Sequence, residues 1–380
     1  MTATAARGQR PASSWLRRIF GALDPVLLSC SSLLSLISLL MLWGGRGTFG
    51  TKCLVVQLGA TVVGFACMVV LANIDYRWLA EKLSPLFFAV SVGLLLLLLF
   101  RGTGAGTNKS WLYFRFLPFG IQPTELIKTA LAISFAYHLS RVRSRLNHPL
   151  SVLGLAVHAG VIVGLIVLTG DLGVALIFVC FLLLMLFCAG LSLWYFGGGA
   201  VVFGALSPLL WKHLNTYQKQ RILVGFRPES DPTGYGRQPL LSRDAIMAGG
   251  FFGDGVGGGR VYASLYASHT DFMYATVCEK LGFFGGILVL ALLVVFIIRA
   301  FSIAARADHE IGAYLCVGLS CCLAVQTIVN IGMCLAVLPV VGITLPFISY
   351  GGSSILGVYL MAGMLHSVSA HRGRYSGLWR

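Results

Sequence analysis

Long apolar runs recur along the chain from near its start to near its end. A helix of roughly 20 residues crosses a hydrocarbon core of about 30 Å, and ten runs approach or exceed this length. They lie near residues 24–43, 52–73, 84–101, 122–140, 149–169, 172–189, 191–211, 271–298, 311–337 and 345–369. None shows the strict polar/apolar alternation of a membrane β-strand. The pattern predicts an all-α polytopic membrane protein, a bundle of about ten transmembrane helices.

Composition agrees with this pattern. Hydrophobic residues make up 57% of the chain and charged residues only 11%, whereas an average soluble domain is about 25% charged. We therefore interpret residues 1–380 as a single membrane domain. It comprises a tail at 1–23, the helices, a long connection at 212–270 and a second tail at 370–380.

Basic residues are distributed unequally between the short connections. Fourteen Lys and Arg residues lie on one side and five on the other. The first set is Arg7, Arg10, Arg17, Arg18, Arg77, Lys82, Arg141, Arg143, Arg145, Arg299, Arg306, Arg372, Arg374 and Arg380. The second set is Arg46, Lys52, Arg101, Lys109 and Arg115. Because cytoplasmic loops carry the excess of Lys and Arg, we expect both termini to be cytoplasmic and the first apolar run to remain as an anchor.

Net charge and cysteine content do not change this picture. The formal charge is +15, but half of the 28 basic residues belong to the side predicted to be cytoplasmic, and none forms a run interleaved with aromatics. We therefore exclude nucleic acid as a partner. Nearly all of the ten cysteines fall within the apolar runs, which predicts packing residues and not a disulfide framework or a metal site.

The connection at 212–270 is about sixty residues long, and loops of this length are usually functional or disordered. Its mixture of Arg, aromatic residues and Gly favours an ordered lid with short helices that folds over the bundle. Its surplus of basic residues suits an anionic partner at the outer membrane surface. Within it, "GDGVGG" from Gly253 matches the dinucleotide fingerprint, but no strand precedes it, so we reject that interpretation.

A carboxylate opens one of the most apolar segments, "SHTDFMYATVCEKLGFFGG", which begins at Ser268. Asp271 has two interpretations, a helix cap or a functional carboxylate. Glu125 and Lys128 lie one helical turn apart in the fourth run, and Asp171 lies between the fifth and sixth. Ionisable groups at membrane depth usually face a cavity or each other. We expect Glu125 and Lys128 to line an outward cavity with Asp271, the alternative being a purely structural ion pair.

Six stretches together resemble one family, the shape, elongation, division and sporulation (SEDS) proteins, which include FtsW and RodA. They are "SWLYFRFLPFGIQPTELIK" from Ser110, "DLG" from Asp171, "YQKQRILVGFRPESDPTGYG" from Tyr217, "AGGFFGDGVGGG" from Ala248, "SHTDFMYA" from Ser268 and "VVGITLPFISYGGSS" from Val340. The chain departs from the family's usual residues at Ala267-Ser268, at Glu279-Lys280 and at Thr169-Gly170.

The resemblance implies a peptidoglycan glycosyltransferase that polymerises lipid II at the outer face of the bacterial cytoplasmic (inner) membrane. It also implies that Asp271 is the general base of an inverting transfer. Arg221, Arg243 and Lys128, or a divalent cation such as Mg²⁺ or Mn²⁺, would neutralise the leaving pyrophosphate. Further candidate substrate-binding residues are Glu125, Gln122, Trp111, His269, Thr270, Ser349 and Gly351.

The implied partner is a class B penicillin-binding protein transpeptidase, together with other membrane proteins of the divisome or elongasome. The spacing from Gly255 to Asp271 favours an FtsW-like member, acting in division, over a RodA-like one. Two alternative functions remain open. A lipid II flippase or transporter would move lipid without forming polymer, and a non-catalytic division scaffold would tolerate loss of Asp271.

Overall fold

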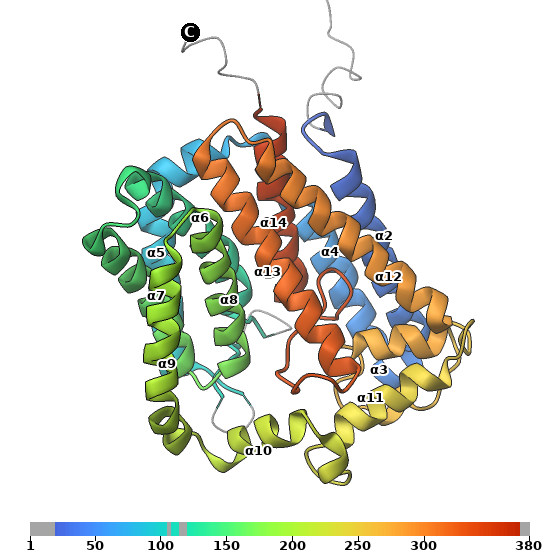
Figure 1. Cartoon of the computed structure of the whole chain (residues 1–380). Coiled ribbons are helices and arrows are strands. Elements are labelled where there is room, and N and C mark those ends of the chain that lie inside the picture. Colours follow the sequence, from blue (N-terminus) through green and yellow to red (C-terminus); the bar gives the residue numbers. More distant parts are fainter. Residues whose placement is uncertain (1–19, 105–107, 114–119, 373–380) are drawn as a thin grey trace, which may run out of the picture.

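The protein is a bundle of helices (Figure 1), seen in a computed structural model that describes residues 20–104, 108–113 and 120–372. Ten helices of the described residues are 17 residues or longer. They are α2 (Pro25–Gly44), α4 (Thr51–Asn73), α5 (Tyr76–Arg101), α6 (Pro123–Val142), α7 (Pro149–Leu168), α8 (Leu172–Cys188), α9 (Leu193–His213), α12 (Met273–Ala305), α13 (Glu310–Cys334) and α14 (Gly352–Ala370). The described residues form no strand beyond isolated bridges, which confirms the all-α class.

Seven of these helices are long and apolar enough to cross a membrane, namely α2, α4, α5, α7, α12, α13 and α14. The apolar helices α8 and α9 have shorter apolar stretches, and α6 contains Glu125 and Lys128. The tails 1–19 and 373–380 and Arg115 lie outside the described residues. All ten cysteines are free, and six of them are buried, which agrees with the packing role predicted for those six.

Small and hydroxyl residues allow the central helices to pack closely. A Cβ placed on Gly64 of α4 would lie 2.8 Å from the Tyr359 ring of α14, so only glycine permits this approach. The Tyr359 hydroxyl in turn hydrogen-bonds the Ser35 hydroxyl of α2 over 2.8 Å. Helix α13 packs against α12, α8 and α6, whereas α9 stands at the edge of the bundle with no buried residue from Leu193 to Leu209 (Figure 1).

The described ends of the chain lie at one end of the bundle (Figure 1). Asp24 caps α2 there, and its carboxylate accepts hydrogen bonds from Arg299 of α12 at 2.6 and 3.0 Å. Its backbone N–H donates to His366 Nδ1 of α14 at 2.9 Å. Helices α3 (Arg46–Phe49), α10 (Thr216–Gly225) and α11 (Arg237–Ala248) lie at the opposite end.

Helix α12 begins at Met273, close to the predicted start, but it is interrupted at Gly282, whose φ is +67°. A Cβ at Gly282 would lie 2.4 Å from the carbonyl oxygen of Phe251, so the loop before α12 passes directly against the break. The Phe283 N–H donates to the Gly250 carbonyl over 2.8 Å. A glycine is therefore required where α12 receives this loop.

Two other boundaries differ from the predicted spans. Helix α5 begins at Tyr76 and not near 84, because Asp75 caps it and Pro85 is accommodated inside it. The last predicted span, 345–369, is wrong in its first turns. Residues 345–351 form a loop in which Phe347 has a φ of +62°, and α14 begins only at Gly352.

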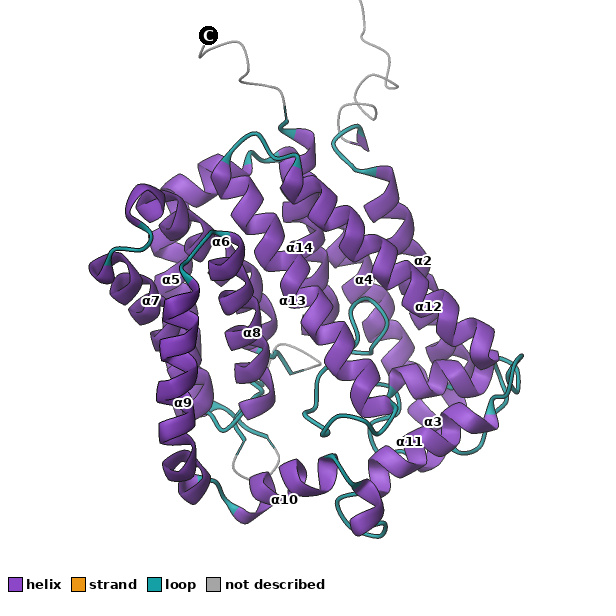
Figure 2. Cartoon of the chain, in the orientation of Figure 1, coloured by secondary structure: helices purple, strands orange, loops and turns teal. Residues whose placement is uncertain are grey.

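The long connection before α12 contains four short helices, as the lid prediction expects, and Figure 2 shows them joined by loops. They are α10 (Thr216–Gly225), η2 (Pro228–Ser230), α11 (Arg237–Ala248) and η3 (Tyr262–Ser264). Asn215 and Gln218 form a capping box that starts α10. The Ser242 hydroxyl of α11 donates to the Cys334 carbonyl at the end of α13 over 2.8 Å, which holds α11 against the bundle.

Candidate active site

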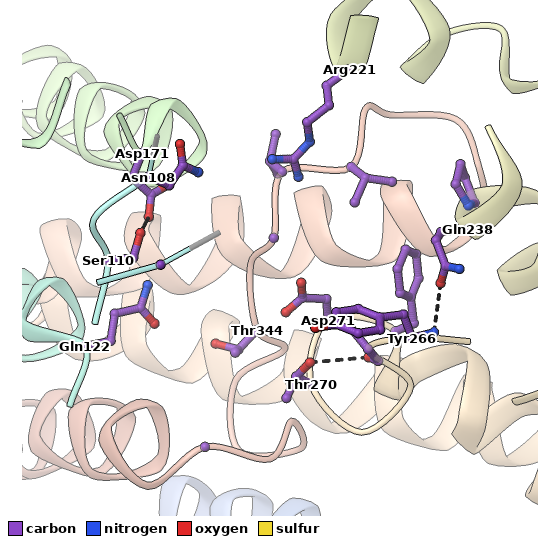
Figure 3. Close-up of a pocket in the computed structure, with 18 of the residues that line it drawn as sticks. Asn108, Ser110, Gln122, Asp171, Arg221, Gln238, Tyr266, Thr270, Asp271 and Thr344 are labelled. Carbon is purple, nitrogen blue, oxygen red and sulfur yellow. Dashed lines mark hydrogen bonds between the residues drawn. The ribbon is translucent and has the colours of Figure 1, made fainter. Parts of the chain in front are cut away.

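A cavity of about 530 Å³ opens at the end of the bundle that carries α10 and α11 (Figure 3). Its walls come from the segment before α6, the start of α8, helices α10 and α11, the residues before α12 and the loop between α13 and α14. Its polar lining residues include Asn108, Ser110, Trp111, Gln122, Asp171, Tyr217, Arg221, Tyr235, Gln238, Tyr266, Thr270, Asp271, Thr344, Tyr350 and Ser354.

Asp271 does not cap α12. The N-cap residue of this helix is Phe272, and no side chain hydrogen-bonds to its first amides. The backbone carbonyl of Asp271 accepts a hydrogen bond from Asn330 Nδ2 of α13 over 2.8 Å, so the main chain is held while the carboxylate faces the cavity. The helix-cap interpretation of Asp271 is therefore wrong.

The two residues before Asp271 are fixed by the loop between α13 and α14. The Ser349 hydroxyl donates to the Thr270 carbonyl over 2.6 Å, and the Tyr350 N–H donates to the His269 carbonyl over 2.8 Å. The His269 ring packs between Phe49 and Tyr350, with centroid distances of 5.1 and 5.3 Å. Thr270 lines the cavity, whereas His269 and Ser349 do not, so these two hold Asp271 in position.

Arg221 of α10 faces the same part of the cavity as Asp271. A Cβ placed on Gly342 would lie 3.5 Å from Asp271 Oδ2 and 3.9 Å from Arg221 Nη2, so both groups border this glycine. Figure 3 shows the guanidinium and the carboxylate entering from different elements. No carboxylate of the described residues lies within ion-pairing distance of Arg221, whose guanidinium lies 5.3 Å from the Tyr217 ring centre. Its charge is thus available to an anionic ligand.

Burial raises the pKa of Asp271 to about 6. The positive charge of Arg221 opposes this rise, and the negative charge of Asp171 adds to it. A carboxylate with a pKa near neutrality is suited to accept a proton during a reaction and to release it afterwards.

Asp171 lies on the opposite wall of the cavity (Figure 3). It caps α8 by accepting from the Val174 N–H at 3.2 Å, and it also accepts from the Ser110 hydroxyl at 2.8 Å. Burial raises its pKa as well. Trp111 and Gln122 line the cavity as expected, and the Gln122 N–H donates to the Ser353 hydroxyl over 3.1 Å.

Glu125 and Lys128 do not line the cavity, so this expectation is wrong. Their side chains are buried, and Lys128 Nζ donates to Glu125 Oε1 over 2.7 Å. Lys128 Nζ also donates to Gln326 Oε1 over 3.0 Å, and Gln326 Nε2 donates to the Thr344 carbonyl over 2.8 Å. Thr344 borders the cavity. The ion pair therefore lies behind the wall and supports it, because two helices and the final loop meet there.

Arg243 also lies outside the cavity. It pairs with Glu229 at 2.7 Å on the surface of the outer segment, where both side chains are exposed. The sequence does not show which of Arg221 and Arg243 reaches the cavity, since both are basic residues in the same long connection. Gly351, also expected at the site, does line the cavity. Within the described chain, no group of three or more His, Cys, Asp and Glu residues is arranged to hold a metal ion.

Comparison with known proteins assigns the chain to a family. The model of the cell cycle protein family FtsW/RodA/SpoVE matches residues 24–374. The chain belongs to this family. It is 34% identical over 316 residues to the probable peptidoglycan glycosyltransferase FtsW of Trichlorobacter lovleyi, covering 83% of this chain and 82% of that protein.

Other relatives come from a second branch of the same family. The chain is 33% identical over 354 residues to the peptidoglycan glycosyltransferase MrdB of Escherichia coli, covering 92% of this chain and 94% of MrdB. Its fold is similar to a chain of a solved peptidoglycan synthase complex, with a TM-score of 0.80 and 27% identity over 93% of this chain and 99% of that chain.

Several cavity residues of this FtsW/RodA/SpoVE family member were not predicted from the sequence. They are Asn108, Ser110, Tyr217, Tyr235, Gln238 and Tyr266. Three of them are tyrosines in or beside the long outer connection. An excess of aromatic residues in a polar segment was the available signal, and only the fold shows which of them reach the cavity.

Proposed function

We propose that Asp271 is the general base with which this peptidoglycan glycosyltransferase polymerises lipid II into glycan strands. The observation that carries the proposal is the Asp271 carboxylate, which faces the cavity beside the guanidinium of Arg221, a charge that no carboxylate of the described residues pairs with. A base for the attacking hydroxyl and a cation for the leaving pyrophosphate are the two groups that this transfer requires.

In the proposed reaction, the 4-hydroxyl of the acceptor sugar attacks the anomeric carbon of the donor. Asp271 takes the hydroxyl proton as the new glycosidic bond forms, and the bond to the lipid pyrophosphate breaks. An α-linked donor then gives a β-linked product in one inverting displacement, which needs no covalent intermediate. Arg221 donates hydrogen bonds to the departing pyrophosphate.

The reaction takes place at the outer face of the bacterial inner membrane, where the end of the bundle with α10 and α11 lies. Its partner is a class B penicillin-binding protein, which crosslinks the strands. The related solved complex, which coordinates polymerization and crosslinking, supports such a partner. Relatives come from both the FtsW and MrdB branches. The spacing between Gly255 and Asp271 favours division.

The test is an assay of purified protein with lipid II, with and without the transpeptidase, analysed for glycan strands. Asp271→Asn should lower turnover at least about 10²-fold, because an amide cannot accept the proton. Lipid II binding should persist, since Arg221 and the cavity remain. The matched control is Asp244→Asn, an exposed carboxylate of α11 outside the cavity, which should leave turnover unchanged.

Two results would overturn the proposal. One is an Asp271→Asn protein that is stably inserted and polymerises lipid II within a few-fold of wild type. The other is wild-type protein that moves lipid II across vesicle membranes without forming any polymer, which would favour a flippase.

A further inference from the structure

We propose that Tyr266 and Gln238 form a saccharide subsite that holds the acceptor strand against Asp271. This inference rests on the proposed function and deepens it, since it assigns the wall of the cavity on which the growing glycan lies. The ligand class is a β-linked N-acetylhexosamine chain. Such a sugar presents an apolar face of C–H groups together with hydroxyl and acetamido groups at its edge.

Tyr266 has the exposure expected of a binding residue and not of a packing residue. It lines the cavity, yet it is 90% exposed. Tyr217 of α10 and Tyr235 contact each other at 5.8 Å between ring centres, and Arg221 lies over Tyr217. Tyr266 forms no ring contact in the described part of the chain. Its ring is thus available to cover the apolar face of a sugar.

Gln238 supplies a polar group beside this ring. Its Oε1 accepts a hydrogen bond from the Tyr266 backbone N–H over 2.9 Å, which fixes both the loop and the carboxamide (Figure 3). With Oε1 engaged, the amide nitrogen is left as a donor, and no described residue accepts from it. A half-buried carboxamide N–H₂ held at the edge of an exposed aromatic ring suits the acetamido carbonyl or a hydroxyl of the sugar.

The position of this pair relative to Asp271 identifies it with the acceptor. In an inverting displacement, the attacking oxygen and the leaving oxygen are on opposite sides of the anomeric carbon. Arg221, which would receive the leaving pyrophosphate, comes from α10. Tyr266 comes from the segment directly before Asp271, and Gln238 holds that segment to α11 (Figure 3). The sugar that gives its proton to Asp271 therefore lies on the Tyr266 side.

The first test is binding of soluble, uncrosslinked glycan fragments to the full chain in nanodiscs, measured by saturation-transfer NMR. Asp271→Asn protein should bind the fragments like wild type. Tyr266→Ala should weaken binding roughly tenfold, the size expected for loss of one aromatic contact. Tyr266→Phe, which keeps the ring, should restore it. Tyr113→Ala, at an exposed tyrosine that does not line the cavity, should leave fragment binding unchanged.

The second test is the length of the product made from lipid II. Tyr266→Ala should shorten the strands and raise the acceptor concentration needed for half-maximal rate, while Tyr266→Phe gives wild-type strands. Fragment binding and strand length that are both unchanged in Tyr266→Ala would overturn the inference and leave the role of Asp271 intact. Conversely, fragment binding that depends on Tyr266 in a protein that makes no polymer would retain the subsite and refute the polymerase.

Discussion

The Asp271 carboxylate combines burial with a neighbouring cation, and the two have opposite effects on its proton affinity. Burial disfavours the ionised form of the carboxylate, while Arg221 favours it. Burial has the larger effect, so the pKa of Asp271 rises to about 6. Only the ionised carboxylate can act as the base. Acidic solution should therefore reduce the rate, although the free energy of substrate binding through Arg221 changes little.

We predict that turnover falls as the pH is lowered through about 6, with the slope of a single protonation. Arg221→Gln removes the charge that favours the carboxylate, so the apparent pKa should rise and the acidic limb should move to higher pH. The measurement is the pH–rate profile of residual turnover. Arg243→Gln, whose guanidinium pairs with Glu229 at the surface, should not move the limb. An acidic limb at the wild-type pH or below it in Arg221→Gln would contradict this electrostatic account.

At the residue scale, sequence was sufficient to find Asp271 but not to decide whether its carboxylate caps α12 or faces a cavity. The distinction depends on Asn330, which binds the Asp271 backbone, and on Phe272, which takes the cap position. Both are effects of tertiary packing. The position of Glu125 and Lys128 was mispredicted for the same reason, because it too depends on tertiary packing. We expected them to line the cavity, with a structural ion pair as the alternative, and the structure shows the buried ion pair. Which face of α6 meets the cavity depends on α13 and α14.

At the element scale, Glu279 and Lys280, which differ from the residues usual in the family, have a structural role. Both side chains are fully buried near the start of α12. Glu279 accepts hydrogen bonds from the backbone N–H groups of residues 260, 261 and 262 at 2.6 to 2.8 Å. Lys280 Nζ donates to the carbonyls of residues 256 and 258 at 2.8 and 2.9 Å. The two opposite charges together hold the glycine-rich loop against α12.

We predict that Glu279→Gln loosens this loop. A carboxamide has only one acceptor oxygen for the three amides that the carboxylate now serves, and a buried donor left unsatisfied costs about 1–3 kcal/mol. Hydrogen exchange at Arg260, Val261 and Tyr262 should accelerate roughly 10- to 100-fold. Glu229→Gln, at an exposed ion pair, is the control and should leave these amides unaffected. Wild-type protection of the three amides in Glu279→Gln would show that the loop is held by other contacts.

Element boundaries were predictable where hydrophobicity alone decides them. The start of α12 lies within two residues of the predicted position. The segment 345–351 was misassigned because it is apolar like a membrane helix, yet its buried Phe347 and Ile348 pack in a loop. Ser349 and Gln57 satisfy the backbone of this loop from side chains, with Gln57 Nε2 donating to the Ser349 carbonyl over 3.1 Å. No periodicity in the sequence reveals such distant partners.

At the scale of the whole molecule, sequence predicted the number of long helices but not their arrangement. Each run is apolar on most faces, so its pattern does not say which side is buried. Helix α14, whose residues are mostly buried, and α9, which has no buried residue from 193 to 209, look alike as apolar runs. The cavity depends on this arrangement, because residues from at least five separate parts of the chain line it.

Orientation in the membrane can be tested at the same scale. The described ends lie at one end of the bundle, and α10 and α11, whose residues line the cavity, lie at the other (Figure 1). The excess of basic residues beside Arg141, Arg143 and Arg145 predicts that the end with the termini is cytoplasmic. Glycan synthesis from lipid II requires the cavity to face outward. Ser144 and Glu229 are exposed polar positions at the two ends, so each can carry a new cysteine.

We predict that a membrane-impermeant maleimide labels Glu229→Cys in intact cells and leaves Ser144→Cys unlabelled until the membrane is opened. The ten native cysteines require a parallel wild-type sample, although most of them lie buried or within helices. Detergent-solubilised protein, in which both new thiols react, controls for accessibility that is limited by packing. Labelling of Ser144→Cys in intact cells would place the basic connections outside. The cavity would then face the cytoplasm, and Asp271 could not act on lipid II at the outer surface.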